Sequence, residues 1–203
     1  MNRNTNDIPG YSYGTSAVAV SSATLDDLLR LKTSLGFTED DERFLFVAGS
    51  VLEDNVERIV NHWRANIIAS IPNLARHSRS LDGSPLPDYL ARSNRRFEQW
   101  IMDTCLRPYD QDWLNYQQEI ALRHTSLKKN QTDNVVSTPY VPYSDIVAFV
   151  AVLSDTIKPY LAAKGHTESD VTNMHKAWCK SMHIQMALWA KPYMETESGR
   201  GEW

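Results

Sequence analysis

The sequence predicts an all-α protein, built as one domain of about eight helices around a single core. Three observations support this prediction. The chain has 203 residues, which is enough to bury a large core. Apolar residues recur at helical spacing along most of the chain. The alternation of apolar and polar residues that is typical of a strand is absent outside the N-terminal segment.

Charge and composition exclude several classes of protein. The formal net charge is -4 and the pI is near 5.8, whereas a general nucleic-acid binder or an anionic-membrane binder needs a basic surface. No apolar run reaches the roughly 18 residues of a membrane span. The N-terminus also lacks the pattern of a secretory leader, so we expect a cytoplasmic protein.

The cysteines and histidines do not form a recognisable metal motif. Cys105 and Cys179 lie far apart in helical patterns, which suits reduced core thiols better than a disulfide framework. The six histidines show neither HExxH nor Cys-x-x-Cys spacing, which argues against a zinc site.

Residues 1–23 are expected to form an irregular arm, because they contain Pro9, Gly10 and Gly14 and have no helical period. Five apolar residues give this arm enough surface to pack on the body of the protein, which a free tail lacks. They are Ile8, Tyr11, Tyr13, Val18 and Val20.

Thr24 is a predicted N-cap for a short helix that ends near Gly36. We expect its buried side to carry Leu25, Leu28, Leu29 and Leu35. Thr38 and the acidic run after it start a second helical stretch that continues almost unbroken to Ser70, with Gly49 as the candidate dividing point.

Residues 71–86 contain two prolines and an Asp-Gly turn, so they are predicted to be a broken connection. The next helix has one face made of Leu90, Ser93, Phe97, Trp100 and Thr104, and Pro108 ends it. Two long helices are expected at about 143–163 and 168–190, with Pro159 as a kink in the first. Residues 195–203 are polar and are expected to be a loose tail.

A lone histidine, His124, ends an amphipathic helix that begins at Asp110. Counting back from it in steps of four, four and three residues gives Ile120, Tyr116 and Trp113, so the imidazole should point inward. A neutral imidazole over an apolar pocket can be an axial ligand of haem iron, but a histidine on an apolar face is more often a hydrogen-bonded core residue. Both interpretations stay open on spacing alone.

Seven segments of the chain together resemble the protoglobin family. They are IPGYSYG (8–14), VLEDNVERIV (51–60), RRFEQWIMDTC (95–105), YDQDWLNYQQEIALRH (109–124), KKNQTDNV (128–135), KPYLAAKGHT (158–167) and ALWAKPY (187–193). The likeness spans nearly the whole chain, including the arm. It implies a globin fold extended by an N-terminal arm and an additional first helix, with residues 24–194 as the globin domain. It also implies haem b, bound through His124 as the proximal ligand, with Tyr116 and Ile120 on the same face of the helix.

On the opposite side of the haem, the resemblance implies a distal pocket made by Trp63, Phe97, Phe149 and Leu153. Here the chain departs from the family, which has Trp-Tyr where this chain has Trp63-Arg64, with one extra residue before Pro72. Three interpretations compete. In the first, Arg64 turns inward and donates a hydrogen bond to the ligand; in the second, Trp63 donates through its indole N–H. In the third, Arg64 is an ordinary solvated residue. The third is the best single expectation, because burial of a guanidinium without a partner is costly.

The resemblance implies that the arm, with Tyr11 and Tyr13, covers the haem edge, and that a homodimer forms through the last two long helices. The residues that could partner the haem propionates are Arg92, Arg95, Arg123, Lys128 and Lys129.

Iron held by one imidazole keeps a position open for O2, CO or NO, so reversible binding of diatomic gases is the favoured function. The alternatives are a haem enzyme that acts on NO, nitrite, peroxide or carbene donors, a gas sensor that works through a partner protein, and a haem-free helical interaction protein. No acid–base pair of the peroxidase kind is evident in the sequence, which favours binding.

Overall fold

The computed structural model describes residues 5–195, and all regular structure in that range is helical. A single isolated bridge joins Arg79 and Pro85. In chain order, with η for 3-10 and π turns, the elements are η1 (Thr5–Asp7), α1 (Leu25–Ser34), α2 (Glu39–Leu52), α3 (Val56–His62), η2 (Trp63–Ile67), η3 (Ile68–Ser70), α4 (Pro72–Ala75), η4 (Arg76–Ser78), α5 (Pro87–Leu106), α6 (Gln111–Leu122), α7 (Tyr143–Thr156), α8 (Lys158–Leu161) and α9 (Glu168–Glu195). The all-α prediction is confirmed.

Local capping explains where three of these helices begin. The Thr24 side chain accepts a hydrogen bond from the backbone N–H of Asp27 at the start of α1 (3.1 Å), and Asp110 accepts one from Trp113 at the start of α6 (2.9 Å). The Asp41 carboxylate accepts from the backbone N–H of Thr38 before α2 (2.8 Å). The starts predicted at Thr24, Thr38 and Asp110 are therefore confirmed.

The buried face of α1 is narrower than the sequence suggests. Leu28 is buried, and Leu35 just beyond the helix packs on the core, but Leu25 and Leu29 are 49% and 62% exposed. Helix α1 makes few contacts with α9, and Leu28 is its buried residue, so Leu25 and Leu29 stay in water. The prediction that Leu25 and Leu29 lie on the buried side was wrong.

Gly49 does not divide the second helical stretch, because α2 runs through it to Leu52. The glycine lies where α2 crosses α5: a Cβ atom on it would meet Leu106 Cδ2 at 2.5 Å and Cys105 Cβ at 3.1 Å. The helix ends at Leu52, and the chain then forms α3, a π turn and a 3-10 turn up to Ser70. The glycine is therefore a close-approach residue and not a break.

Three other boundaries differ from the sequence predictions. The connection after Ser70 contains the short α4 and η4, because Pro72 can occupy the first turn of a helix without losing a hydrogen bond. The helix expected at 143–163 ends at Thr156, and Pro159 lies in the separate α8. Helix α9 continues past Ala190 to Glu195. Of the expected loose tail, residues 196–203 lie outside the described residues.

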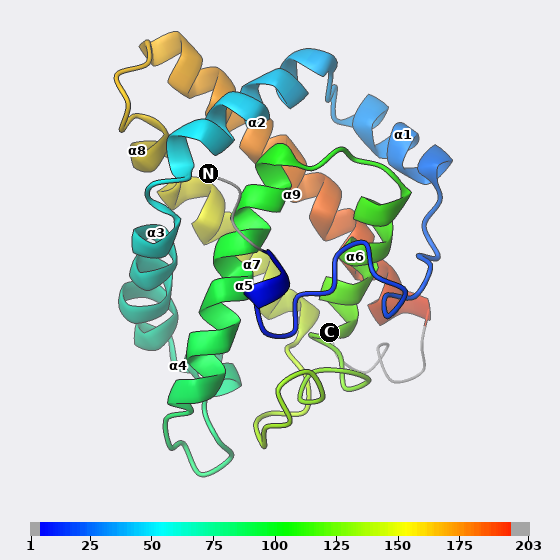
Figure 1. The fold of residues 1–203 in the computed structure, drawn as a ribbon, viewed down its shortest axis with the longest axis vertical. Helices are drawn as coiled ribbons and strands as arrows, with labels where there is room; N and C mark the ends of the chain where they lie inside the picture. Colours follow the sequence, from blue (N-terminus) through cyan, green and yellow to red (C-terminus); the bar gives the residue numbers. More distant parts are fainter. Residues whose placement is uncertain (1–4, 196–203) are drawn as a thin grey trace.

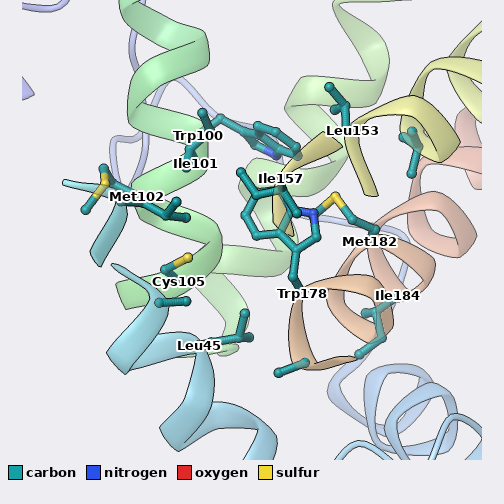
Figure 2. Close-up of a cluster of buried hydrophobic side chains, with 14 of the residues drawn as sticks. Leu45, Trp100, Ile101, Met102, Cys105, Leu153, Ile157, Trp178, Met182 and Ile184 are labelled. Carbon is teal, nitrogen blue, oxygen red and sulfur yellow. The ribbon is translucent and has the colours of Figure 1, made fainter. Parts of the chain in front are cut away.

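The core lies where α2, α5, α7 and α9 meet, and Figure 2 shows Trp178 at its centre beside Ile157, Leu45 and Met182. Trp178, Met182 and Trp189 of α9 are buried inside the chain. These three side chains therefore belong to this core.

In Figure 1, residues 5–23 of the arm cross in front of α5 and α6, and α3 lies to the left of α5. Cys105 and Cys179 are both free thiols, as expected. Of the helices in the described part of the chain, none is both long and apolar enough to cross a lipid bilayer.

The helix crossing at Gly49 predicts the effect of one substitution. Gly49→Val should lower the free energy of unfolding by about 1–3 kcal/mol, because a branched side chain has no room between α2 and α5. Thermal unfolding should show a lower Tm, by roughly 2–4 °C for each kcal/mol.

The matched control for this substitution is Ser50→Val, which places the same side chain at the exposed neighbouring position of α2. It should change stability far less. Adding Leu106→Ala to Gly49→Val should restore part of the loss, since Leu106 supplies the closest atoms. Equal Tm values for the two valine variants would contradict the steric explanation.

Candidate functional site

A cavity of about 250 Å³ opens between α5, α6, α7 and the turn η2. This volume is far above the roughly 10–15 Å³ that one buried water needs, so the cavity is of a size for a larger ligand. Its lining is mainly apolar and aromatic, with a minority of charged groups. The residues predicted to hold the haem or to line its ligand pocket that do line this cavity are Arg64, Phe97, Tyr116, Ile120, His124, Phe149 and Leu153.

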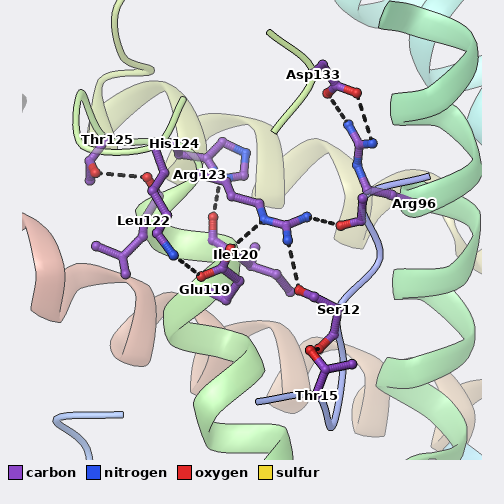
Figure 3. Close-up of polar contacts among 12 residues, drawn as sticks. Ser12, Thr15, Arg96, Glu119, Ile120, Leu122, Arg123, His124, Thr125 and Asp133 are labelled. Carbon is purple, nitrogen blue, oxygen red and sulfur yellow. Dashed lines mark hydrogen bonds and ion pairs between the residues drawn. The ribbon is translucent and has the colours of Figure 1, made fainter. Parts of the chain in front are cut away.

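His124 enters the cavity from the turn that follows α6. The helix ends at Leu122, and the His124 backbone N–H still donates to the Ala121 carbonyl (2.9 Å). Its ring nitrogen Nδ1 lies 2.7 Å from the Ile120 carbonyl oxygen, one turn earlier in the helix (Figure 3). A carbonyl can only accept, so Nδ1 carries the proton and Nε2 carries the lone pair.

The imidazole of His124 is neutral at ordinary pH. Burial lowers its pKa to about 4, because the cavity disfavours the charged form, and only the Ile120 carbonyl works in the opposite direction. Within residues 5–195, Nε2 has no hydrogen-bond partner. A neutral ring with one fixed tautomer and a free lone pair is the form in which histidine binds a metal.

Trp63 is the one predicted pocket residue that does not line the cavity. Its side chain is fully buried behind Phe97, with the two ring centroids 5.3 Å apart. The indole N–H donates to the Thr156 hydroxyl at 2.9 Å. That donor is already used, so the structure does not support the interpretation in which Trp63 donates to a ligand.

Arg64 projects from the π turn into the cavity and is not an ordinary solvated residue, so that sequence interpretation was wrong. Its guanidinium donates to Asn94 Oδ1 (3.1 Å), to Ser93 Oγ (2.7 Å) and to Ser78 Oγ (3.3 Å), and it lies over the Phe97 ring, 5.4 Å from the centroid. These neutral partners offset the cost of burial, which lowers the pKa of Arg64. No sequence pattern brings these four residues together.

Of the residues considered for the haem propionates, only Arg123 and Lys129 line the cavity. Arg92 is bonded to Asp133, Lys128 is bonded to Glu119, and Arg95 is exposed. Lys129 is 8% exposed and donates to the His77 carbonyl at 3.1 Å, and burial lowers the pKa of its ammonium to about 8.

His77 and Asp145 are cavity residues that sequence reasoning missed. Both nitrogens of the buried His77 ring are engaged, Nδ1 with Thr138 Oγ1 (2.8 Å) and Nε2 with Asp145 Oδ2 (3.1 Å). Burial lowers the pKa of His77 despite the carboxylate, so the ring is neutral. It lies in the broken connection, where no periodicity marks a buried side chain.

The arm packs against the residues at the edge of this cavity. Tyr116, which lines it, meets the rings of Tyr11 and Tyr13 edge-on, each with a centroid distance of 5.4 Å. Arg123 donates to the Gly10 carbonyl (2.7 Å) and to Ser12 Oγ (2.9 Å) while its Nε bonds Glu119, and Figure 3 shows it bridging the arm and α6. Arg96 donates in the same way to the Pro9 carbonyl (2.7 Å).

The residues that line the cavity are of the kinds that could hold a haem group. Within the described chain, no three His, Cys, Asp or Glu side chains gather closely enough to hold a metal ion by themselves. A single neutral imidazole therefore suits a metal whose remaining ligands come from a cofactor. Aromatic and aliphatic walls suit the flat porphyrin, and cationic side chains in the lining suit its carboxylates.

The comparisons with known proteins agree with this fit. No curated protein matches the chain. The family model described as Protoglobin matches residues 24–198, which is most of the chain. The chain thus belongs to the protoglobin family, a family of haem-binding and gas-binding proteins with the globin fold.

Proposed function

We propose that this protein holds haem b in the cavity with His124 as the proximal ligand and binds diatomic gases there. The observation that carries the proposal is the state of the His124 ring, which is neutral, fixed by Ile120 and has a free Nε2. Haem iron held by one imidazole supplies an open position for O2, CO or NO. The chain's contribution is to orient the ring and to exclude water.

The walls support the orientation of a flat cofactor. Phe97 and Phe149, with ring centroids 6.3 Å apart, contribute aromatic surface from α5 and α7, and Leu153 adds aliphatic surface one turn beyond Phe149. Tyr116 and Ile120 lie on the same helix face as His124. Arg64 is the polar group that we assign to the ligand, because its guanidinium faces the cavity beside Phe97.

Gas binding is favoured over peroxide chemistry by the state of His77. A peroxidase-like reaction needs a free acid–base group beside the ligand. Apart from His124, His77 is the histidine that lines the described cavity, and both of its nitrogens are already bonded. In the described cavity, His77 therefore offers no free ring nitrogen that would act on a ligand.

A homodimer through α7 and α9 is a further part of the proposal and rests on the family likeness. Sedimentation of the purified protein would test it, and a monomer at every accessible concentration would contradict it.

The axial role of His124 gives a direct prediction. His124→Ala should lose haem or bind it much more weakly, by more than the roughly 10–100-fold that loss of a supporting contact costs a metal site. The measurement is the Soret absorbance after addition of haem, together with the ferrous spectrum.

The control for this variant is His183→Ala. His183 is exposed, and its Nδ1 contacts the carbonyl four residues earlier, as in His124, at 2.6 Å. This variant should bind haem normally. An unchanged five-coordinate ferrous spectrum in His124→Ala would refute the role of His124 as the proximal ligand.

Arg64 should control how long O2 stays bound. Arg64→Leu removes the donors and should raise the O2 dissociation rate by about tenfold to a hundredfold, the usual effect of one hydrogen bond from a charged group. The CO rate should respond less, because CO is the less polar ligand. Arg95→Leu removes the same charge from an exposed position of α5 and should leave both rates unchanged. Identical O2 rates in all three proteins would refute the role of Arg64.

The arm should protect the pocket from solvent. Gly10 has φ of 74°, and a Cβ atom there would lie 2.7 Å from Thr132 Cγ2 and 3.0 Å from Arg96 Nη1. Gly10→Val should therefore detach the arm, speed its proteolytic cleavage, and raise the rate at which the ferrous protein oxidises in air.

Gly14→Val is the matched control for the arm. Gly14 has a similar φ of 68°, but a Cβ atom there meets nothing within 4 Å, so this variant carries the backbone strain without the clash. Equal oxidation rates in the two variants would mean that close docking of the arm at Gly10 has no part in protection.

A further inference from the structure

The guanidinium of Arg64 is a buried cation without an anionic partner. Its three hydrogen bonds go to Asn94, Ser93 and Ser78, all of them neutral. A guanidinium has five N–H donors, and these contacts use one each from Nε, Nη1 and Nη2. One donor on each of the two terminal nitrogens is left for a ligand in the cavity.

The two other arginines of the lining are already compensated. Arg96 is bonded to Asp133, and Arg123 is bonded to Glu119. Both also donate to arm carbonyls. The positive charge of each is therefore neutralised by its carboxylate partner, and both side chains hold the arm in place.

The lining as a whole is positive, although the chain carries a net charge of -4. It contains four cationic side chains, Arg64, Arg96, Arg123 and Lys129, against the two carboxylates Asp133 and Asp145. In a cavity with aromatic walls, this imbalance acts at short range and is weakly screened by salt.

We infer that Arg64 gives the pocket a preference for small inorganic monoanions such as azide over neutral ligands of similar size. This inference rests on the haem pocket proposed above and assigns its charge selectivity to one residue. A small anion meets the two free donors of Arg64 and supplies the negative charge that the neighbours of Arg64 lack. A neutral ligand of similar size supplies no such charge.

Binding of azide by the ferric holoprotein tests the inference, with neutral imidazole as the comparison ligand and optical titration at constant ionic strength as the measurement. Arg64→Leu should weaken azide binding by about tenfold to a hundredfold. The same variant should not weaken imidazole binding. Arg95→Leu should leave both affinities unchanged, because Arg95 is exposed and does not line the cavity.

If Arg64→Leu does not fold, Arg64→Gln loses the charge but keeps a polar group near the position of Nε, which bonds Asn94. The same result is expected of this variant. The inference is overturned if azide affinity does not change, or if azide and imidazole affinities fall together. It is also overturned if the variant loses haem faster while azide affinity holds, because Arg64 would then serve a propionate. A wild-type protein without a Soret band would instead refute the haem pocket itself.

Discussion

The hydrogen bond between His124 Nδ1 and the Ile120 carbonyl determines what the cavity can hold. Without it the ring could rotate or exchange its tautomer, and the lone pair would have no fixed direction. The contact exists because α6 ends at Leu122, which brings the side chain of His124 back over the last turn of the helix. Asp110 fixes the other end of the same helix by capping it at Trp113. The direction of one nitrogen thus depends on where a twelve-residue helix begins and ends.

Across the cavity, the position of Arg64 depends on a non-standard turn. The residues from Trp63 to Ile67 form a π turn, which holds more residues than an α-helical turn. Trp63 stays in the core, bonded to Thr156, while its neighbour Arg64 faces the cavity. The π turn thus separates two neighbouring side chains, one directed into the core and one into the cavity.

Local signals made much of the fold predictable, and distant contacts limited the rest. The starts of α1, α2 and α6 follow from capping residues at most three positions away, and the inward direction of His124 follows from helical spacing. The burial of Arg64 does not follow from either. Its hydrogen-bond partners lie 14, 29 and 30 residues after it in the sequence, so no local pattern around Arg64 predicts them. The expectation that it was solvated applied a sound energetic rule without knowledge of the partners that offset the cost.

The same distinction explains the errors at Gly49 and His77. A glycine inside a helical pattern either breaks the helix or allows a close approach, and only the position of α5 decides between them. His77 is buried because Thr138 and Asp145 come to it from 61 and 68 residues away. In both cases the residue type suggests a special role, but the residues that define this role lie far away in the sequence. The inward direction of His124 needs no such remote partner, because its contact with the Ile120 carbonyl lies within one turn of the helix. The charge of the cavity is harder to predict, since part of it comes from Arg64, whose hydrogen-bond partners are all distant in the sequence.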